Sequence, residues 1–214
     1  MASTSTPTTV GSTCATCWAD ADVSALDEAP QVHADDRTTW RSWLEANHAT
    51  SSGVWVVTWR PRSGRQGLEY EAAIEEALCF GWVDSTAGTV DEERGKLYFA
   101  PRKPRGGWAA TNKVRIERLI AEGRMAPAGL AAIERAKADG SWEVLDSVER
   151  LEVPEDLVAA LGASPPAAIN FAAFPPSARK NLLAWVAFAK RPETRAARIR
   201  QIAAAAARNE RARG

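Results

Sequence analysis

The chain has 214 residues and a mass of 23.1 kDa, which is enough for one generous domain or for a domain with a small appendage. Its hydrophobic share of 45% and charged share of 25% are ordinary for a globular protein, and three cysteines do not make a disulfide framework at this length. The formal net charge is zero, but residues 1–36 hold six of the 27 acids and none of the 27 basic residues, so the remainder is net +6. Nine tryptophans against two tyrosines predict a well-filled core or a groove lined by some of the rings.

Residues 1–34 are expected to form a disordered leader, because they are first Ser/Thr-rich and then acidic, without sustained periodicity. The leader contains a CxxC motif, Cys14 and Cys17, but two further zinc ligands at useful spacing are lacking, so neither a metal nor a cofactor is expected. The N-terminus has no basic and apolar signal regions, and no window approaches the length of a membrane span. These features predict a cytoplasmic protein without membrane insertion.

Order is expected to begin at Asp35 and Asp36, which can cap a helix over 37–48. The run over 53–59 is β-branched and aromatic on both faces, as in a central strand covered on both sides. A helix over 69–80 follows, with Glu71, Glu75 and Glu76 expected mostly toward solvent and Gly81 as its terminator. Strands over 82–86 and 96–101 then predict an antiparallel hairpin, and its second strand either ends at Pro101 or lies at an edge of the sheet.

The rest of the chain is predicted to be helical, with helices over 107–123 and after Pro127, and then a proline-punctuated region of three or four short helices. The expected fold class is α+β, with a small antiparallel sheet packed against helices and an all-helical C-terminal subdomain. The expected division is a leader at 1–34, a core domain at 35–140 and a helical subdomain at 141–214.

A candidate ligand-binding site surrounds the hairpin. Trp82 and Asp84 share one strand face, and the returning strand places Arg102 on a face with Tyr98. If these faces pair, Asp84 and Arg102 come within salt-bridge reach beside a tryptophan, which suits a planar or anionic ligand.

The next helix adds two residues to this site. Trp108 and Asn112 fall on one stripe with core-type residues. Two explanations of Asn112 stay open: it bonds a nearby backbone group, or it points into a polar pocket with the other site residues. The candidate ligand-binding residues are therefore Trp82, Asp84, Arg102, Trp108 and Asn112, and no catalytic residue is assigned.

The order and spacing of several motifs are similar to the YdeI/OmpD-associated family, also labelled bacteriocin-protection proteins. The motifs are EEALCFGWVD (75–84), FAPR (99–102), Trp108 followed by Asn112-Lys113, and EGRMAPAG (122–129), with PEDLxxAL (154–161) and the Phe174–Arg179 and Ala189–Ile199 patterns matching the family's small helical domain. The chain departs from the family where it has Ser85 in place of glycine and Gly106-Gly107 in place of serines.

The resemblance implies a core like the small YjbR/CyaY-like two-layer α+β domains. It also implies an association with resistance to antimicrobial peptides and with envelope stress. No established enzyme activity comes with the family, so the function has to be argued from the site itself.

Three functions compete. A non-catalytic module would bind a peptide, a small molecule or a protein partner through the candidate site. An enzyme would use Asp84 as general base and Arg102 as electrostatic stabiliser, with Cys79 as a less supported nucleophile. Nucleic-acid binding would use the basic residues of the 102–124 region, but the pI near 6.8 and the lack of a recognised motif argue against it. Those residues are Lys103, Arg105, Lys113, Arg115 and Arg118.

Overall fold

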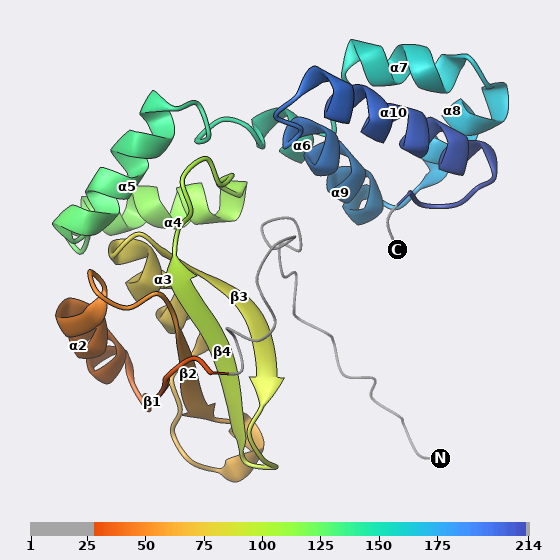
Figure 1. The fold of residues 1–214 in the computed structure, drawn as a ribbon. Helices are drawn as coiled ribbons and strands as arrows, with labels where there is room; N and C mark the ends of the chain where they lie inside the picture. Colours follow the sequence, from red (N-terminus) through yellow and green to blue (C-terminus); the bar gives the residue numbers. More distant parts are fainter. Residues whose placement is uncertain (1–27, 213–214) are drawn as a thin grey trace, which may run out of the picture.

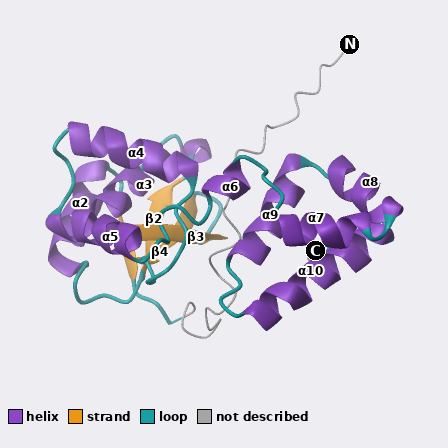
Figure 2. Cartoon of the chain, turned by 90° about the horizontal axis from the view of Figure 1, so that it is seen from above, coloured by secondary structure: helices purple, strands orange, loops and turns teal. Residues whose placement is uncertain are grey.

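A computed structural model describes residues 28–212, and the arrangement of their elements is α+β (Figure 1). A four-stranded sheet with helices packed against it forms the first part, and five helices form the second. Seen from above, α2, α3, α4 and α5 gather around the sheet, while α7 to α10 form a separate cluster (Figure 2). The CxxC pair Cys14 and Cys17 lies outside the described residues.

The first helix begins where the acidic cap predicts. Helix α2 spans Arg37–Asn47, and the Asp36 carboxylate accepts a hydrogen bond from the Thr39 amide at 2.7 Å. The structure differs from expectation just before this cap, because Gln31–His33 form strand β1 inside the segment assigned to the leader. A three-residue strand is too short to leave a periodic signal in the sequence.

The sheet has the order β1-β2-β4-β3. Strand β2 (Val54–Trp59) is central, as predicted, and a 3-10 turn, η2 (Pro61–Ser63), follows it. Strands β3 (Trp82–Thr89) and β4 (Arg94–Pro101) form the expected antiparallel hairpin, and β2 pairs antiparallel with β4. The sheet is mixed rather than wholly antiparallel, because β1 pairs parallel with β2.

Helix α3 (Tyr70–Cys79) is the centre of the core, since every residue from Ala72 to Cys79 is buried. It packs with α2 on the sheet face that carries Val54, Val56 and Phe99. Helix α5 (Pro127–Ala138) approaches the end of α3 so closely that a Cβ at Gly129 would lie 2.2 Å from the Cys79 carbonyl oxygen. Helix α4 (Ala110–Ala121) lies beside α3 and adds Ile116 and Leu119 to this core.

The C-terminal part has a second apolar core of its own. Its five helices among the described residues are α6 (Asp146–Glu149), α7 (Glu155–Gly162), α8 (Pro165–Ala173), α9 (Pro176–Ala187) and α10 (Pro192–Ala207). The four longer helices begin at or next to a proline, as the positions of the prolines in the sequence predict. The single-turn helix α6 was not predicted, because four residues are too few to show helical periodicity.

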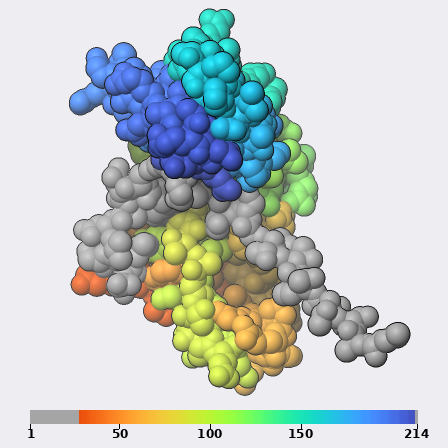
Figure 3. All heavy atoms as spheres, turned by 90° about the vertical axis from the view of Figure 1, so that its right-hand side faces the viewer, coloured from red at the N-terminus to blue at the C-terminus, as the bar shows by residue number. Residues whose placement is uncertain are grey.

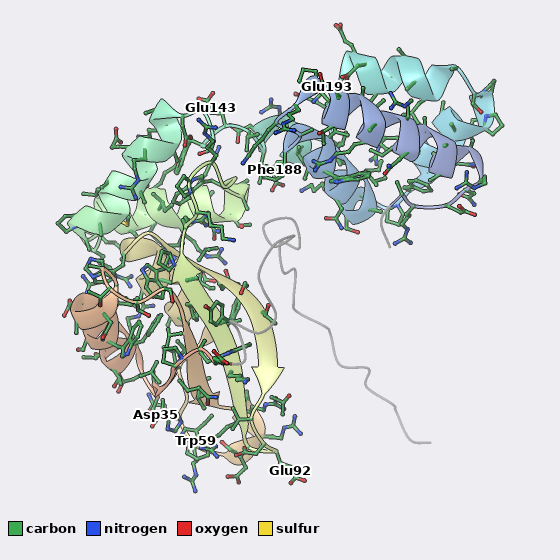
Figure 4. All side chains as sticks on the ribbon, viewed as in Figure 1. Asp35, Trp59, Glu92, Glu143, Phe188 and Glu193 are labelled. Carbon is green, nitrogen blue, oxygen red and sulfur yellow. The ribbon has the colours of Figure 1, made fainter. Side chains whose placement is uncertain are left out.

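The two parts meet around Gly107. A Cβ at this glycine would lie 2.7 Å from Phe188 Cζ and 2.8 Å from Leu145 Cδ1, so side chains of the helical part press on the backbone before α4. Phe188 stands on the side of the helical part that faces the core (Figure 4). Lys113 of α4 also forms an ion pair with Asp146 of α6.

Candidate functional site

Trp82 belongs to the interior of the core. Its side chain is 1% exposed, its Nε1 donates to the His48 carbonyl oxygen at 3.3 Å, and its ring meets Trp43 edge to face at 5.8 Å. Gly81 ends α3 in the left-handed region with φ of 75°, which turns the chain into β3 as predicted. Trp82 is therefore a core residue.

Arg102 and Trp108 form the predicted pair of a guanidinium and an indole. The Arg102 Cζ atom lies 3.8 Å from the centroid of the Trp108 ring, and its Nη1 donates to the Gly107 carbonyl oxygen at 3.3 Å. Trp108 is 2% exposed and also packs on Trp142, with ring centroids 5.1 Å apart. The stacked arginine thus fastens the loop before α4 at the junction of the two parts.

The expected meeting of Asp84 with Arg102 is wrong. The register of the hairpin pairs Asp84 with Phe99, and Trp82 with Pro101, so the face of Asp84 is not the face of Tyr98 and Arg102. Asp84 instead accepts a hydrogen bond from the Tyr70 hydroxyl at 3.0 Å. A one-residue difference in register is enough to exchange the two faces of a strand.

Asn112 joins a polar cluster that includes Asp84, as the second explanation expected in part, and its partner is a side chain rather than a backbone group. Its Oδ1 accepts from Arg115 Nη1 at 2.9 Å, one turn along the same helix. Arg115 in turn forms a fork on Glu71, with both nitrogen–oxygen distances at 2.7 Å. The amide therefore orients an arginine that links α4 to α3.

These contacts bring together one polar cluster at the surface, which we call the Tyr70 patch. It consists of Tyr70, Glu71, Asp84, Asn112 and Arg115. Two of the five, Asp84 and Asn112, are predicted site residues. The other three were missed, although Tyr70 and Glu71 stand in the first turn of a helix that the sequence does predict.

The Tyr70 patch offers a hydrogen-bond donor, acceptors and a fixed positive charge. Tyr70 is half exposed, and its pKa rises to about 12, first through partial burial of the phenol and then through the Asp84 carboxylate. The hydrogen bonds from Arg115 lower the pKa of Glu71 below its usual value. At neutral pH the phenol therefore remains a donor and Glu71 remains a carboxylate.

A second charged cluster lies inside the core, and here the sequence-based expectation is wrong. Glu75 and Glu76 are 2% and 1% exposed rather than turned to solvent. Arg37 contacts both carboxylates, at 2.7 and 2.8 Å, and Arg41 contacts Glu76 at 2.8 Å. Arg118 pairs with Glu75, and Arg124 contacts both, at 3.2 and 2.6 Å.

These six residues, the buried Glu–Arg cluster, join α2, α3, α4 and the segment before α5. Four arginines around two carboxylates satisfy the charge that burial would otherwise make very costly. The arginines on α2 stand at an i, i+4 spacing on one helix face, and this spacing is a sequence signal that could have indicated a common partner.

Cys79 lies against this cluster and is fully buried. Burial raises the pKa of its thiol to about 11, with the Glu76 carboxylate as the next cause. A thiol that stays protonated at neutral pH is a poor nucleophile. His48 ends α2 as expected, with Nδ1 2.8 Å from the Leu44 carbonyl oxygen.

Within residues 28–212, no group of three or more His, Cys, Asp and Glu side chains is arranged to hold a metal ion. In the same range, no helix combines the length and the apolarity that a bilayer crossing requires.

Two family models match the chain, and they divide it close to the structural boundary. Residues 32–132 match a domain of unknown function, DUF8412, and residues 150–209 match the model described as "Bacteriocin-protection, YdeI or OmpD-Associated". The resemblance seen in the sequence is therefore confirmed for the helical part, whereas the core with the Tyr70 patch matches the other model. The searches of curated proteins and of solved structures found no match. The chain thus carries, behind a segment that matches a domain of unknown function, a segment that matches the model of the bacteriocin-protection, YdeI or OmpD-associated family.

Proposed function

We propose that the protein is a non-catalytic binding protein that takes part in protection against bacteriocins or other antimicrobial peptides under envelope stress, and that the Tyr70 patch is its contact site. The observation that carries the proposal is the convergence of Tyr70, Asp84 and Arg115 from α3, β3 and α4 on one surface. Trp82, Trp108 and Arg102 hold the elements beneath and beside it. The family of the helical segment suggests the biological context.

Binding is favoured over catalysis by the state of the reactive groups. The phenol of Tyr70 and the thiol of Cys79 have pKa values near 12 and 11, so both are protonated at neutral pH. The carboxylates of Glu75 and Glu76 are enclosed by arginines. A general base should titrate near the working pH, and the Tyr70 phenol and the Cys79 thiol do not meet that requirement.

The enzyme alternative required Asp84 and Arg102 to act on one substrate. Asp84 is bonded to Tyr70, whereas Arg102 is stacked on Trp108 and bonded to Gly107. A joint catalytic role has no geometric support from these contacts.

Nucleic-acid binding is disfavoured by the pairing of the basic residues on α4. Lys113 pairs with Asp146, Arg115 with Glu71 and Arg118 with Glu75. Phosphate contacts would have to compete with these carboxylates. We also propose the cytoplasm as the compartment, which cell fractionation tests.

The test is survival of cells that express the protein during challenge with an antimicrobial peptide. Asp84→Asn and Arg115→Gln should each remove protection, because they delete the carboxylate charge beside Tyr70 and the forked cation of the Tyr70 patch. Glu134→Gln is the matched control, since Glu134 is an exposed carboxylate on α5 that pairs with Lys137 at 3.1 Å. Each purified variant should keep its cooperative thermal unfolding. Full protection by both patch variants would overturn the proposal.

A further inference from the structure

Among residues 28–212, strand β3 forms one edge of the sheet. The order β1-β2-β4-β3 leaves its other side without a paired strand among residues 28–212. Figure 3 shows the lower part of β3 and the hairpin at the molecular surface. Its residues Thr86, Ala87 and Thr89 are exposed.

The backbone groups that face outward follow from the pairing. The Val90 amide donates to the Arg94 carbonyl oxygen at 3.2 Å, and the register aligns Gly88 with Lys96. Because bonding alternates along an antiparallel strand, the amides and carbonyls of Ala87 and Thr89 point away from β4. Among residues 28–212, no hydrogen bond satisfies these outward backbone groups.

The edge lacks most of the features that keep edge strands from pairing. Residues 85–90 read STAGTV, without lysine, proline or an inward-pointing charge. The opposite edge, β1, is protected by its length of three residues. A bulge between Asp84 and Ala87 interrupts β3, but the register is regular again from Ala87 to Thr89.

Acidic residues flank this edge at both ends, and between them Arg60 Nη2 donates to the Thr89 hydroxyl oxygen at 2.7 Å. Asp84 stands before the bulge, and the exposed Asp91, Glu92 and Glu93 form the hairpin loop. Arg94 pairs with Asp91 at 2.6 Å, whereas Glu92 and Glu93 make no ion pair within residues 28–212. Glu92 stands at the far tip of the hairpin from the helical part (Figure 4).

We propose that β3 accepts an extended, basic peptide as an added strand, with backbone bonds to Ala87 and Thr89 and with basic side chains near Asp84 and Glu92–Glu93. The inference rests on the proposed binding function and names the chemistry of its partner. Strand addition draws affinity from main-chain hydrogen bonds, and the flanking carboxylates select a peptide of opposite charge.

The probe is the acetylated and amidated peptide KTVTKTVTK, titrated into the full-length protein and followed by amide hydrogen exchange and nuclear magnetic resonance shifts. The amides of Ala87 and Thr89 should gain protection of at least about tenfold at saturation, since they become hydrogen-bonded. A peptide with glutamates in place of the lysines, and one with N-methyl groups on alternate amides, should each bind at least about tenfold more weakly.

Ala87→Pro in the protein should weaken binding by about tenfold or more, because proline removes an outward donor that β4 does not use. If that variant fails to unfold cooperatively, Ala87→Lys takes its place, since an edge lysine repels the basic probe while the residue stays exposed. Glu134→Gln should bind the probe normally.

Unchanged exchange at Ala87 and Thr89, equal binding of the glutamate peptide, or dimerisation of the free protein through β3 would each overturn the inference. The two proposals can fail separately. If Asp84→Asn cells lose protection but the peptide does not add to β3, the proposed function still holds, and only the assignment of β3 as the peptide site is wrong.

Discussion

The two parts of the chain are stabilised by different kinds of interaction. The α+β core buries two carboxylates and covers them with partly exposed arginines, whereas the helical part fills its core with apolar residues and keeps its ion pairs outside. In the core, Arg124 Nη2 reaches the almost fully buried Glu76 at 2.6 Å. In the helical part, Arg195 reaches the half-exposed Asp156 at a similar 2.7 Å. The same contact therefore has very different energetic weight in the two places.

The largest effect is expected in the buried Glu–Arg cluster. Glu76→Ala removes the buried carboxylate that three partly exposed arginines contact, and loss of one partner of a buried pair costs about 3–5 kcal/mol. Chemical denaturation of the purified variant measures the free energy of unfolding. A loss below about 1 kcal/mol would mean that water reaches this cluster freely.

A smaller loss is expected at the junction of the two parts. Gly107→Ala places a Cβ at 2.7 Å from Phe188 Cζ, and such overpacking costs about 1–3 kcal/mol. Because the contact joins the two cores, calorimetry should show the unfolding of the helical part separating from that of the α+β core. Gly162→Ala is the control, since nothing lies within 4 Å of a Cβ there. A single unshifted transition in the Gly107 variant would contradict the contact.

The third prediction concerns pH and the Tyr70 patch. Tyr70 has a folded pKa of about 12, above its ordinary value, so its contribution to stability is complete below about pH 10 and is lost as the pH rises toward 12. Ultraviolet absorbance of tyrosinate follows this titration, and Tyr70→Phe isolates the signal of Tyr98, the second of two tyrosines. Asp84→Asn should lower the pKa of Tyr70, because the neighbouring negative charge is gone. An unchanged midpoint would show that the two side chains do not interact.

The smallest effect is expected on the surface of the helical part. Asp156→Asn removes the forked contact with Arg195, and exposed pairs contribute about 0.2–1 kcal/mol. Denaturation in low and high salt measures this contribution, which should shrink as salt rises. If Asp156→Asn lowered the free energy of unfolding as much as Glu76→Ala, the exposed and the buried ion pairs would contribute equally to stability, against this comparison.

Local signals in the sequence were sufficient for most of the fold. The Asp36 cap, the β-branched run of β2, Gly81 and the prolines each act within a few residues, so helices, hairpin and helical part could be predicted. Strand β1 depends on pairing with β2, which is more than twenty residues away in the chain, and no local pattern reports it.

The candidate site was harder to predict because it depends on register and on long-range pairs. The alternation of side chains along a strand places Trp82 and Asp84 on one face, and this is observed. The register, however, pairs Asp84 with Phe99, so Arg102 lies on the opposite face of the hairpin. Helical periodicity alone assigned Glu75 and Glu76 to solvent, since it does not reveal arginines on other helices that can neutralise them. A helix buried on all sides has no polar face to read.

The central claim is that the surface of the α+β core, and not that of the helical part, makes the protective contact. Survival under antimicrobial-peptide challenge should be compared between cells that express Tyr70→Phe/Asp84→Asn and cells that express Asp156→Asn/Arg195→Gln, at matched protein levels. We expect the first pair of substitutions to abolish protection and the second to preserve it. Protection that survives the first pair and is lost with the second would contradict this account.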